Sequence, residues 1–207
     1  MPMMPVKGAY KPPKPQNKGD IVLVDGGFIP GIPLWDHAAI HYSSGWCIEA
    51  DPHVEAWPEP WNETPPSQIP EDVCIWLEET YGRVEWTTTT KLYNEYKDSI
   101  KKGRVAMAYY KLRPKWAGWC DDAADFAEQK LGRYFDLLSY WHYNSKQVDE
   151  NEDPDRGARY YCSELVWAAY RKHGVKLDND WPENKVTPSE LANNYKTVRY
   201  FKIGNPI

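Results

Sequence analysis

The stretch that decides the fold is DHAAIHYSSGWCIEA, residues 36–50. Two short apolar runs flank Ser43-Ser44-Gly45, and this arrangement predicts a β-hairpin. Gly45 can adopt the left-handed backbone conformation that closes such a loop. A three-residue loop puts three cross-strand pairs on one buried face: Tyr42 with Trp46, Ile40 with Ile48, and Ala38 with Ala50.

The same register gathers polar side chains on the opposite face of the hairpin. That face carries His37, Ala39, His41, Cys47, Glu49 and Asp51. Glu49 lies opposite Ala39 and diagonal to both His37 and His41, within reach of either ring. A two-residue loop would bury the Glu49 carboxylate beside Ile40 and is therefore disfavoured. A carboxylate beside an imidazole fixes its tautomer, but a solvated polar face remains an alternative at this point.

Outward from the hairpin, strands and helices are mixed without regular alternation, which predicts an α+β fold. GDIVLV (19–24) reads as a buried strand. Gly174 ends a helix predicted from Cys162, and Thr187-Pro188-Ser189-Glu190 has the spacing of a capping box. The other expected elements are strands at 83–87, 105–112 and 197–203, helices at 90–101 and 117–131, and irregular stretches at 51–72 and 141–158.

Length, charge and hydropathy indicate the domain organisation and the classes of partner that the protein can have. The 207 residues suit one domain, residues 19–207, behind a proline-rich tail at 1–18. A net charge of −5 and a pI near 5.6 argue against a nucleic-acid partner. No apolar run is long enough to span a membrane, and the N-terminus lacks the apolar core of a signal peptide. We therefore expect a cytoplasmic protein without a membrane span.

The four cysteines form no CxxC pair and match no zinc-finger spacing. Cys162 differs from the others because it falls in the first turn of a predicted helix. Backbone N–H groups and the helix dipole favour a thiolate at such a position. Cys47, Cys74 and Cys120 are interpreted as small buried hydrophobic residues.

Five segments together resemble a known family. GDIVLV, DHAAIHYSSGWCIEA, LGRYFDLL, YYCSELVWAAYRKHGVKL and TPSEL are similar to the circularly permuted NlpC-type, papain-like cysteine amidases of the YiiX/YebB kind. In that family the strands with the histidine precede the helix with the cysteine, and this chain has the same order. The resemblance spans about residues 19–195. The segment 51–86, rich in Pro, Trp and acidic residues, is longer than a minimal member needs.

The resemblance implies a Cys-His-Glu triad. It assigns the nucleophile to Cys162, the base to His37 and the orienting acid to Glu49. It also implies an acyl-enzyme mechanism that needs no cofactor and no metal, with the Cys162 N–H as an oxyanion donor. The expected substrates are small peptides, cell-wall peptides or acylated small molecules.

Three other functions stay open. The same triad could transfer acyl groups or cleave lipid esters. A non-catalytic module could bind sugars or lipid on a surface formed by Trp46, Trp57, Trp61, Trp76 and Trp86. A zinc site could use His37, His41, Cys47 and Glu49, although no motif spacing supports it.

Overall fold

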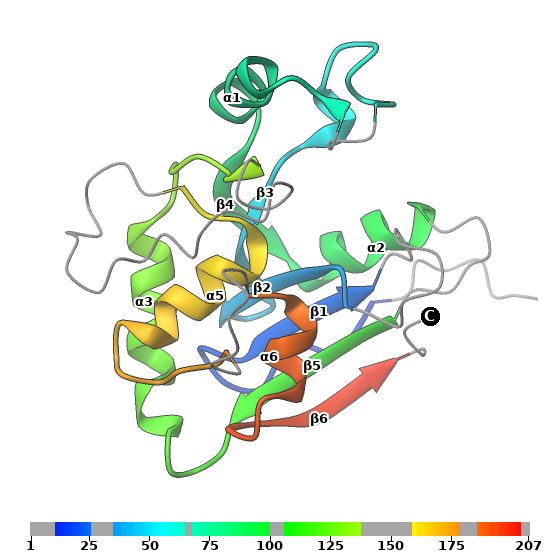
Figure 1. The fold of residues 1–207 in the computed structure, drawn as a ribbon. Coiled ribbons are helices and arrows are strands. Elements are labelled where there is room, and N and C mark those ends of the chain that lie inside the picture. Colours follow the sequence, from blue (N-terminus) through cyan, green and yellow to red (C-terminus); the bar gives the residue numbers. More distant parts are fainter. Residues whose placement is uncertain are drawn as a thin grey trace, which may run out of the picture.

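A six-stranded antiparallel sheet forms the centre of the molecule (Figure 1). The computed structural model describes residues 11–25, 35–64, 68–99, 106–137, 159–178 and 186–203. The strand order is β4-β3-β2-β1-β5-β6. The strands are β1 (Ile21–Asp25), β2 (His37–Ser43), β3 (Trp46–Asp51), β4 (Arg83–Thr88), β5 (Ala106–Leu112) and β6 (Thr197–Ile203). Together with the helices they form the mixed α+β architecture that the sequence predicts.

The hairpin of β2 and β3 has the predicted register but a different turn. Ile40 lies opposite Ile48, and Ala39 lies opposite Glu49. The predicted pairing of Tyr42 with Trp46 is wrong, because Ser43 pairs with Trp46 and the register shifts between His41 and Ser43. The turn itself is Ser44-Gly45, whose positive φ angles of 52° and 87° suit a tight two-residue loop. The register shift is a β-bulge that leaves one extra residue in β2. Because of this extra residue, Glu49 and Ile40 stay on opposite faces of the hairpin.

Helices cover both faces of the sheet. The larger core lies between one face and the helices α3 (Cys120–Gln129) and α5 (Cys162–Arg171). The smaller core, on the other face, includes Leu92 of α2 (Thr89–Ser99). The apolar residues of β1 are divided between the two cores, which explains why its five residues are all buried.

The helices agree with most of the sequence predictions. The helix expected at 117–131 is a 3-10 turn, Ala117–Trp119, followed by α3. The predicted cap at Thr187 is present: its Oγ1 accepts a hydrogen bond from the Glu190 N–H at 3.2 Å and opens α6 (Pro188–Asn193). The end of the helix expected at 90–101 and the irregular stretch 141–158 lie outside the described residues.

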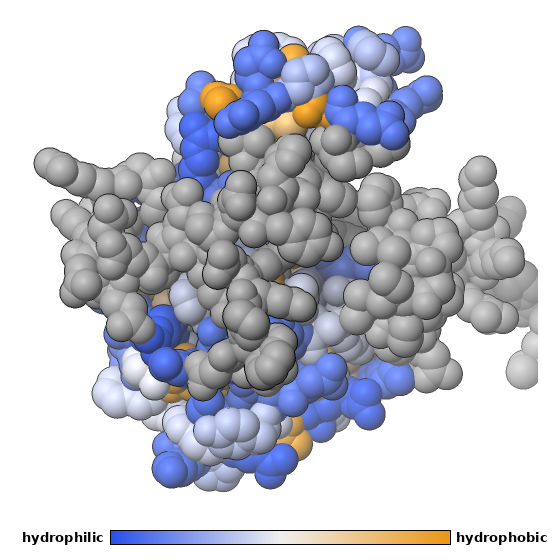
Figure 2. Space-filling model, viewed as in Figure 1, coloured by the Kyte–Doolittle hydropathy of each residue, from blue (hydrophilic) through white to orange (hydrophobic). Residues whose placement is uncertain are grey.

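A projection at one end of the sheet carries a helix that the sequence analysis missed (Figure 1). It consists of the 3-10 helix η1 (Val54–Ala56), the turns after it, and α1 (Glu71–Thr80). Proline before the helix and two acids, Glu71 and Asp72, in its first turn were the available signals. Figure 2 shows this projection as mainly hydrophilic with scattered apolar spots. Ile75 of α1 is one of the exposed large hydrophobic residues.

The N-terminal segment packs against the sheet from residue 11 onward. The Tyr109 hydroxyl donates to the Pro13 carbonyl at 2.7 Å, and the Gln16 N–H donates to the Tyr200 hydroxyl at 3.0 Å. The domain boundary at residue 19 remains a prediction. None of the helices in the described ranges combines the length and apolar character needed to cross a bilayer.

Candidate active site

The start of α5 is fixed by hydrogen bonds on both sides of Cys162. The Tyr161 N–H donates to Glu164 Oε2 at 3.3 Å, within the first turn. The Tyr161 hydroxyl accepts from the Val186 N–H, and the Ser163 hydroxyl donates to the Val186 carbonyl, both at 2.9 Å. Cys162 is the first residue of the helix and is 3% exposed. Its thiol is therefore held where the helix presents unpaired N–H groups.

The start of β2 meets this thiol. The segment before β2 is fixed because the Trp35 N–H donates to the Ser189 hydroxyl at 3.0 Å, and the Asp36 N–H to the Val24 carbonyl, also at 3.0 Å. Sγ of Cys162 then lies 4.0 Å from the Asp36 carbonyl oxygen. The thiol is also within hydrogen-bond reach of the backbone N–H of Ala38.

His37 lies between Cys162 and Glu49. Its Nε2 is 2.5 Å from Glu49 Oε2, and both side chains are buried. The ring also forms a side-chain hydrogen bond with Cys162. Because Glu49 occupies Nε2, the nitrogen left for the thiol is Nδ1. The structure thus brings Cys162, His37 and Glu49 into one chain of contacts.

The electrostatics of this pair favour charge separation. Burial opposes ionisation of the Cys162 thiol, but attraction to His37 and hydrogen bonds from Ala38 and Ser163 outweigh it, so its pKa is lowered. Burial also disfavours a charged His37 ring, but Cys162 and then Glu49 outweigh that effect and raise the pKa of His37 well above 6.5. The opposite shifts describe a thiolate next to an imidazolium.

His41, which shares the sheet face with His37, has a different environment. Its Nδ1 donates to the Asn17 carbonyl at 2.7 Å, and its Nε2 accepts from the Gly45 N–H at 3.2 Å. Burial lowers the pKa of this ring. Both ring nitrogens of His41 therefore form hydrogen bonds, one with the N-terminal segment and one with the hairpin turn, and the ring is neutral.

The other three thiols lack the environment of Cys162. Burial raises the pKa of Cys47 well above 9, that of Cys74 to about 11, and that of Cys120 above its usual value. Among the residues that the structure describes, no histidine ring contributes to the pKa of any of these three thiols. The zinc set considered from the sequence does not come together either, since His37 and His41 bind different partners.

The five tryptophans considered as a stacking surface are divided between different environments. Trp57 is buried and donates through Nε1 to the Pro52 carbonyl at 2.9 Å. Trp46 and Trp86 are exposed and meet edge to face at a centroid distance of 6.4 Å. Trp76 of α1 packs against Tyr81, the residue after the helix. They do not form one continuous aromatic surface.

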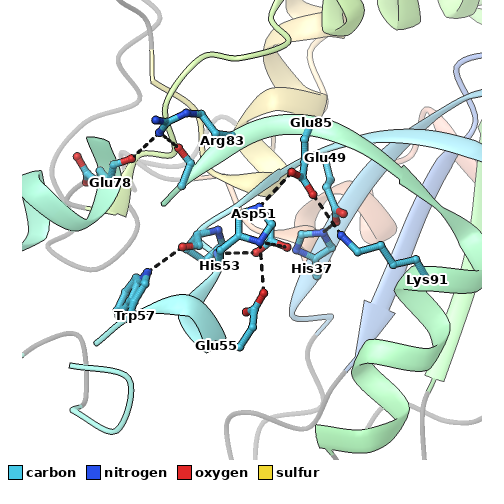
Figure 3. Close-up of polar contacts among 12 residues, drawn as sticks. His37, Glu49, Asp51, His53, Glu55, Trp57, Glu78, Arg83, Glu85 and Lys91 are labelled. Atoms are coloured by element: carbon cyan, nitrogen blue, oxygen red, sulfur yellow. Dashed lines mark hydrogen bonds and ion pairs between the residues drawn. The ribbon is translucent and has the colours of Figure 1, made fainter. Parts of the chain in front are cut away.

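A polar cluster that was not predicted from the sequence lies beside His37 and Glu49 (Figure 3). It contains Asp51 at the end of β3, His53 after it, and Glu85 on β4. Glu85 is directly opposite Glu49 in the β3–β4 pair. The sequence gives no signal for this contact, because Glu85 lies 32 residues from His53.

Comparisons with known proteins give one structural similarity. No family model matches the chain, and no curated protein matches it either. A solved structure, that of the metalloprotein YiiX from Escherichia coli O157:H7, is similar with a TM-score of 0.48 and 15% sequence identity. The similarity covers 90% of this chain and 97% of YiiX. At this level it transfers no activity and no metal site to this chain.

Proposed function

We propose that this protein is a cysteine hydrolase that cleaves an amide bond through Cys162, His37 and Glu49. One observation carries the proposal: the buried His37 ring contacts the Glu49 carboxylate and the Cys162 thiol at the same time. The order of the three residues along the chain also agrees with the resemblance to permuted papain-like amidases of the NlpC type. The expected substrates remain small peptides, cell-wall peptides or N-acylated small molecules.

In the acylation step, the Cys162 thiolate attacks the carbonyl carbon of the substrate. A C–S bond forms, and the carbonyl electrons move onto oxygen, where the Cys162 N–H at the helix start is one donor. Collapse of this intermediate breaks the C–N bond. The protonated His37 ring gives its Nδ1 proton to the departing amine, which leaves a thioester on Cys162.

In the deacylation step, the neutral His37 ring removes a proton from water, and the resulting hydroxide attacks the thioester carbonyl. The C–S bond breaks, the acid product leaves, and the thiolate–imidazolium pair is restored. Glu49 acts throughout by holding Nε2, which keeps Nδ1 directed at sulfur and stabilises the charged ring. Its short contact with Nε2 supports this orienting role.

The time course of p-nitrophenyl acetate hydrolysis, followed from the first turnover, tests the proposed acyl-enzyme. The wild-type protein is expected to release p-nitrophenol, first in a burst of one equivalent per chain and then at the slower rate of deacylation. Cys162→Ala removes the nucleophile and should abolish the burst, while Glu49→Gln should slow it. An unchanged burst in Cys162→Ala would exclude this cysteine as the nucleophile.

The alternative of acyl transfer uses the same triad and the same acyl-enzyme. Hydrolysis and acyl transfer differ in the nucleophile that attacks the thioester. Addition of a primary amine as acceptor separates them: an acyltransferase forms the amide in preference to the acid, whereas a hydrolase forms mainly the acid. We favour hydrolysis as the simpler reaction, since water is the only co-substrate required.

A further inference from the structure

The polar cluster beside the triad contains three side chains with the chemistry of metal ligands. Asp51, His53 and Glu85 each offer one ligand atom, and these atoms all lie within 4.8 Å of one another. They come from the end of β3, the residue before η1 and the middle of β4. Two of them are only two residues apart, so one short segment supplies most of the group.

We propose that Asp51, His53 and Glu85 bind one divalent transition-metal ion. Imidazole nitrogen and carboxylate oxygen are both donors that Zn²⁺ accepts, and catalytic zinc sites take three protein ligands and leave a position for water. The same donors suit other first-row divalent ions. The site does not involve the thiol of Cys162, so it stands independently of the proposed hydrolase activity.

The carboxylates of the cluster surround the His53 ring. Asp51 Oδ1 accepts the backbone N–H of His53 at 3.0 Å, and its Oδ2 lies 3.7 Å from His53 Nδ1. On the other side of the ring, Glu85 Oε2 lies 3.1 Å from Nε2. Glu55 adds a further oxygen 3.3 Å from Nδ1. Carboxylate oxygens therefore lie at both nitrogens of the His53 ring, and one ligand atom from each of the three residues lies within 4.8 Å of the other two.

Glu49 gives a second and independent indication. It is 1% exposed, and its Oε1 has no hydrogen-bond partner among the described residues. Glu49 faces Glu85 across the strand pair, and Figure 3 draws the two carboxylates next to each other. An unpaired buried carboxylate oxygen is costly, and a cation in the neighbouring cluster would reduce that cost.

A proton and a lysine currently balance the charge of the cluster. The hydrogen bond to Glu85 and the nearby acids raise the pKa of His53 to about 9, so the ring carries a proton at neutral pH. A metal ion must displace that proton into solvent before His53 can coordinate. Lys91 lies 3.2 Å from Glu85 Oε1, which leaves Oε2 for the metal.

Titration with Zn²⁺ against a chromophoric chelator tests the site. The full chain is expected to bind one Zn²⁺, and His53→Gln and Glu85→Gln should each weaken this binding at least tenfold. Two controls should bind like the wild type. One is His173→Gln, which changes a histidine stacked on Trp119, and the other is Cys162→Ser, which removes the competing thiol.

Two results would overturn the site. The first is binding that survives His53→Gln and Glu85→Gln but is lost in Cys162→Ser, because the ion would then lie at the triad. The second is the absence of stoichiometric binding to the wild-type chain. If either variant fails to fold, the absorption of the Co²⁺-loaded wild type decides instead: nitrogen and oxygen ligands give no thiolate charge-transfer band, and such a band would contradict the proposal.

Discussion

At the scale of single residues, the four thiols are distinguished by their surroundings more than by their exposure. All four are buried, yet the pKa of Cys162 alone is lowered, because His37 outweighs the effect of burial. The other three have raised pKa values with burial as the main cause. The reactivity of a thiol at neutral pH follows its thiolate fraction, so Cys162 should react clearly faster than the other three cysteines.

We therefore predict that limiting iodoacetamide alkylates Cys162 first. His37→Ala should slow this reaction at pH 7 by about tenfold for each unit by which the thiol pKa rises. The rates of the variant and the wild type should converge at high pH, where both thiols are ionised. Peptide mapping by mass spectrometry measures the order, and earlier labelling of Cys47, Cys74 or Cys120 would refute the assignment.

His41 gives a second prediction at this scale, concerning stability. Burial lowers its pKa below 6.5, so the folded protein binds this proton more weakly than the unfolded chain does. Its stabilising effect is present above pH 6.5 and is lost as the pH falls through the folded value. The raised pKa values of His37 and His53 act in the opposite sense and above that range.

The free energy of unfolding should consequently fall as the pH decreases from about 6.5 toward the lowered pKa of His41, by less than about 1.4 kcal/mol per pH unit for this one proton. His41→Gln should flatten the slope in this interval. Urea unfolding at several pH values measures how the free energy of unfolding changes with pH. Equal slopes for the variant and the wild type would show that His41 does not titrate on unfolding.

At the scale of elements, the hairpin shows what a sequence can and cannot predict. The faces of β2 and β3 follow from alternation, so the pairing of Ala39 with Glu49 could be derived. The bulge near Tyr42 could not, because a three-residue loop and a two-residue loop with a bulge leave the same register. Backbone angles decide between them, and these are not encoded in the hydrophobic pattern.

Gly45 tests the turn. Its φ of +87° is unfavourable for a residue with a side chain, so Gly45→Ala should cost about 1 kcal/mol of stability. Ser44→Gly is the matched control: Ser44 already has a positive φ, and its replacement should change stability by less than about 0.5 kcal/mol. Chemical denaturation compares the two, and a neutral Gly45→Ala would argue against the tight turn.

The helix α1 and the cluster of Asp51, His53 and Glu85 were not predicted, for two different reasons. The apolar pattern of α1 is weak, with Cys74, Leu77 and Glu78 as its buried residues, and it follows a proline-rich segment. The cluster depends on the pairing of β3 with β4, a contact between segments far apart in the chain. By contrast, the proximity of Cys162, His37 and Glu49 could be predicted, because the hairpin and a helix start carry these residues. Their roles as a triad remain a prediction, in which the family resemblance chooses between the two histidines.

At the scale of the whole molecule, Gly19 is the point where several elements meet. Its N–H donates to the His41 carbonyl at 2.7 Å, and its carbonyl accepts from the Tyr170 hydroxyl of α5. A Cβ at this position would lie 2.3 Å from the backbone oxygen of Cys120, the first residue of α3. The N-terminal segment, β2, α3 and α5 are thus joined at one residue.

Gly19→Ala should cost at least about 2 kcal/mol, because a backbone clash adds to the cost of a positive φ. Gly174→Ala is the control, since it has a similar φ of +78° but no atom within 4 Å of the added Cβ. It should cost only the backbone component, about 1 kcal/mol. Equal unfolding midpoints for the two variants would contradict the close packing at Gly19.

The triad itself depends on this whole-molecule packing, since Cys162 comes from α5 and the other two members from the β2–β3 hairpin. Acylation of Cys162 by an activated ester, followed by intact mass and peptide mapping, tests the assignment most directly in the wild type, His37→Ala and His41→Ala. Circular dichroism verifies that each variant folds. His37→Ala should acylate about 10²–10⁴-fold more slowly, as expected for loss of a general acid–base, whereas His41→Ala should acylate at close to the wild-type rate. Rapid acylation of His37→Ala together with loss of acylation in folded His41→Ala would contradict the triad.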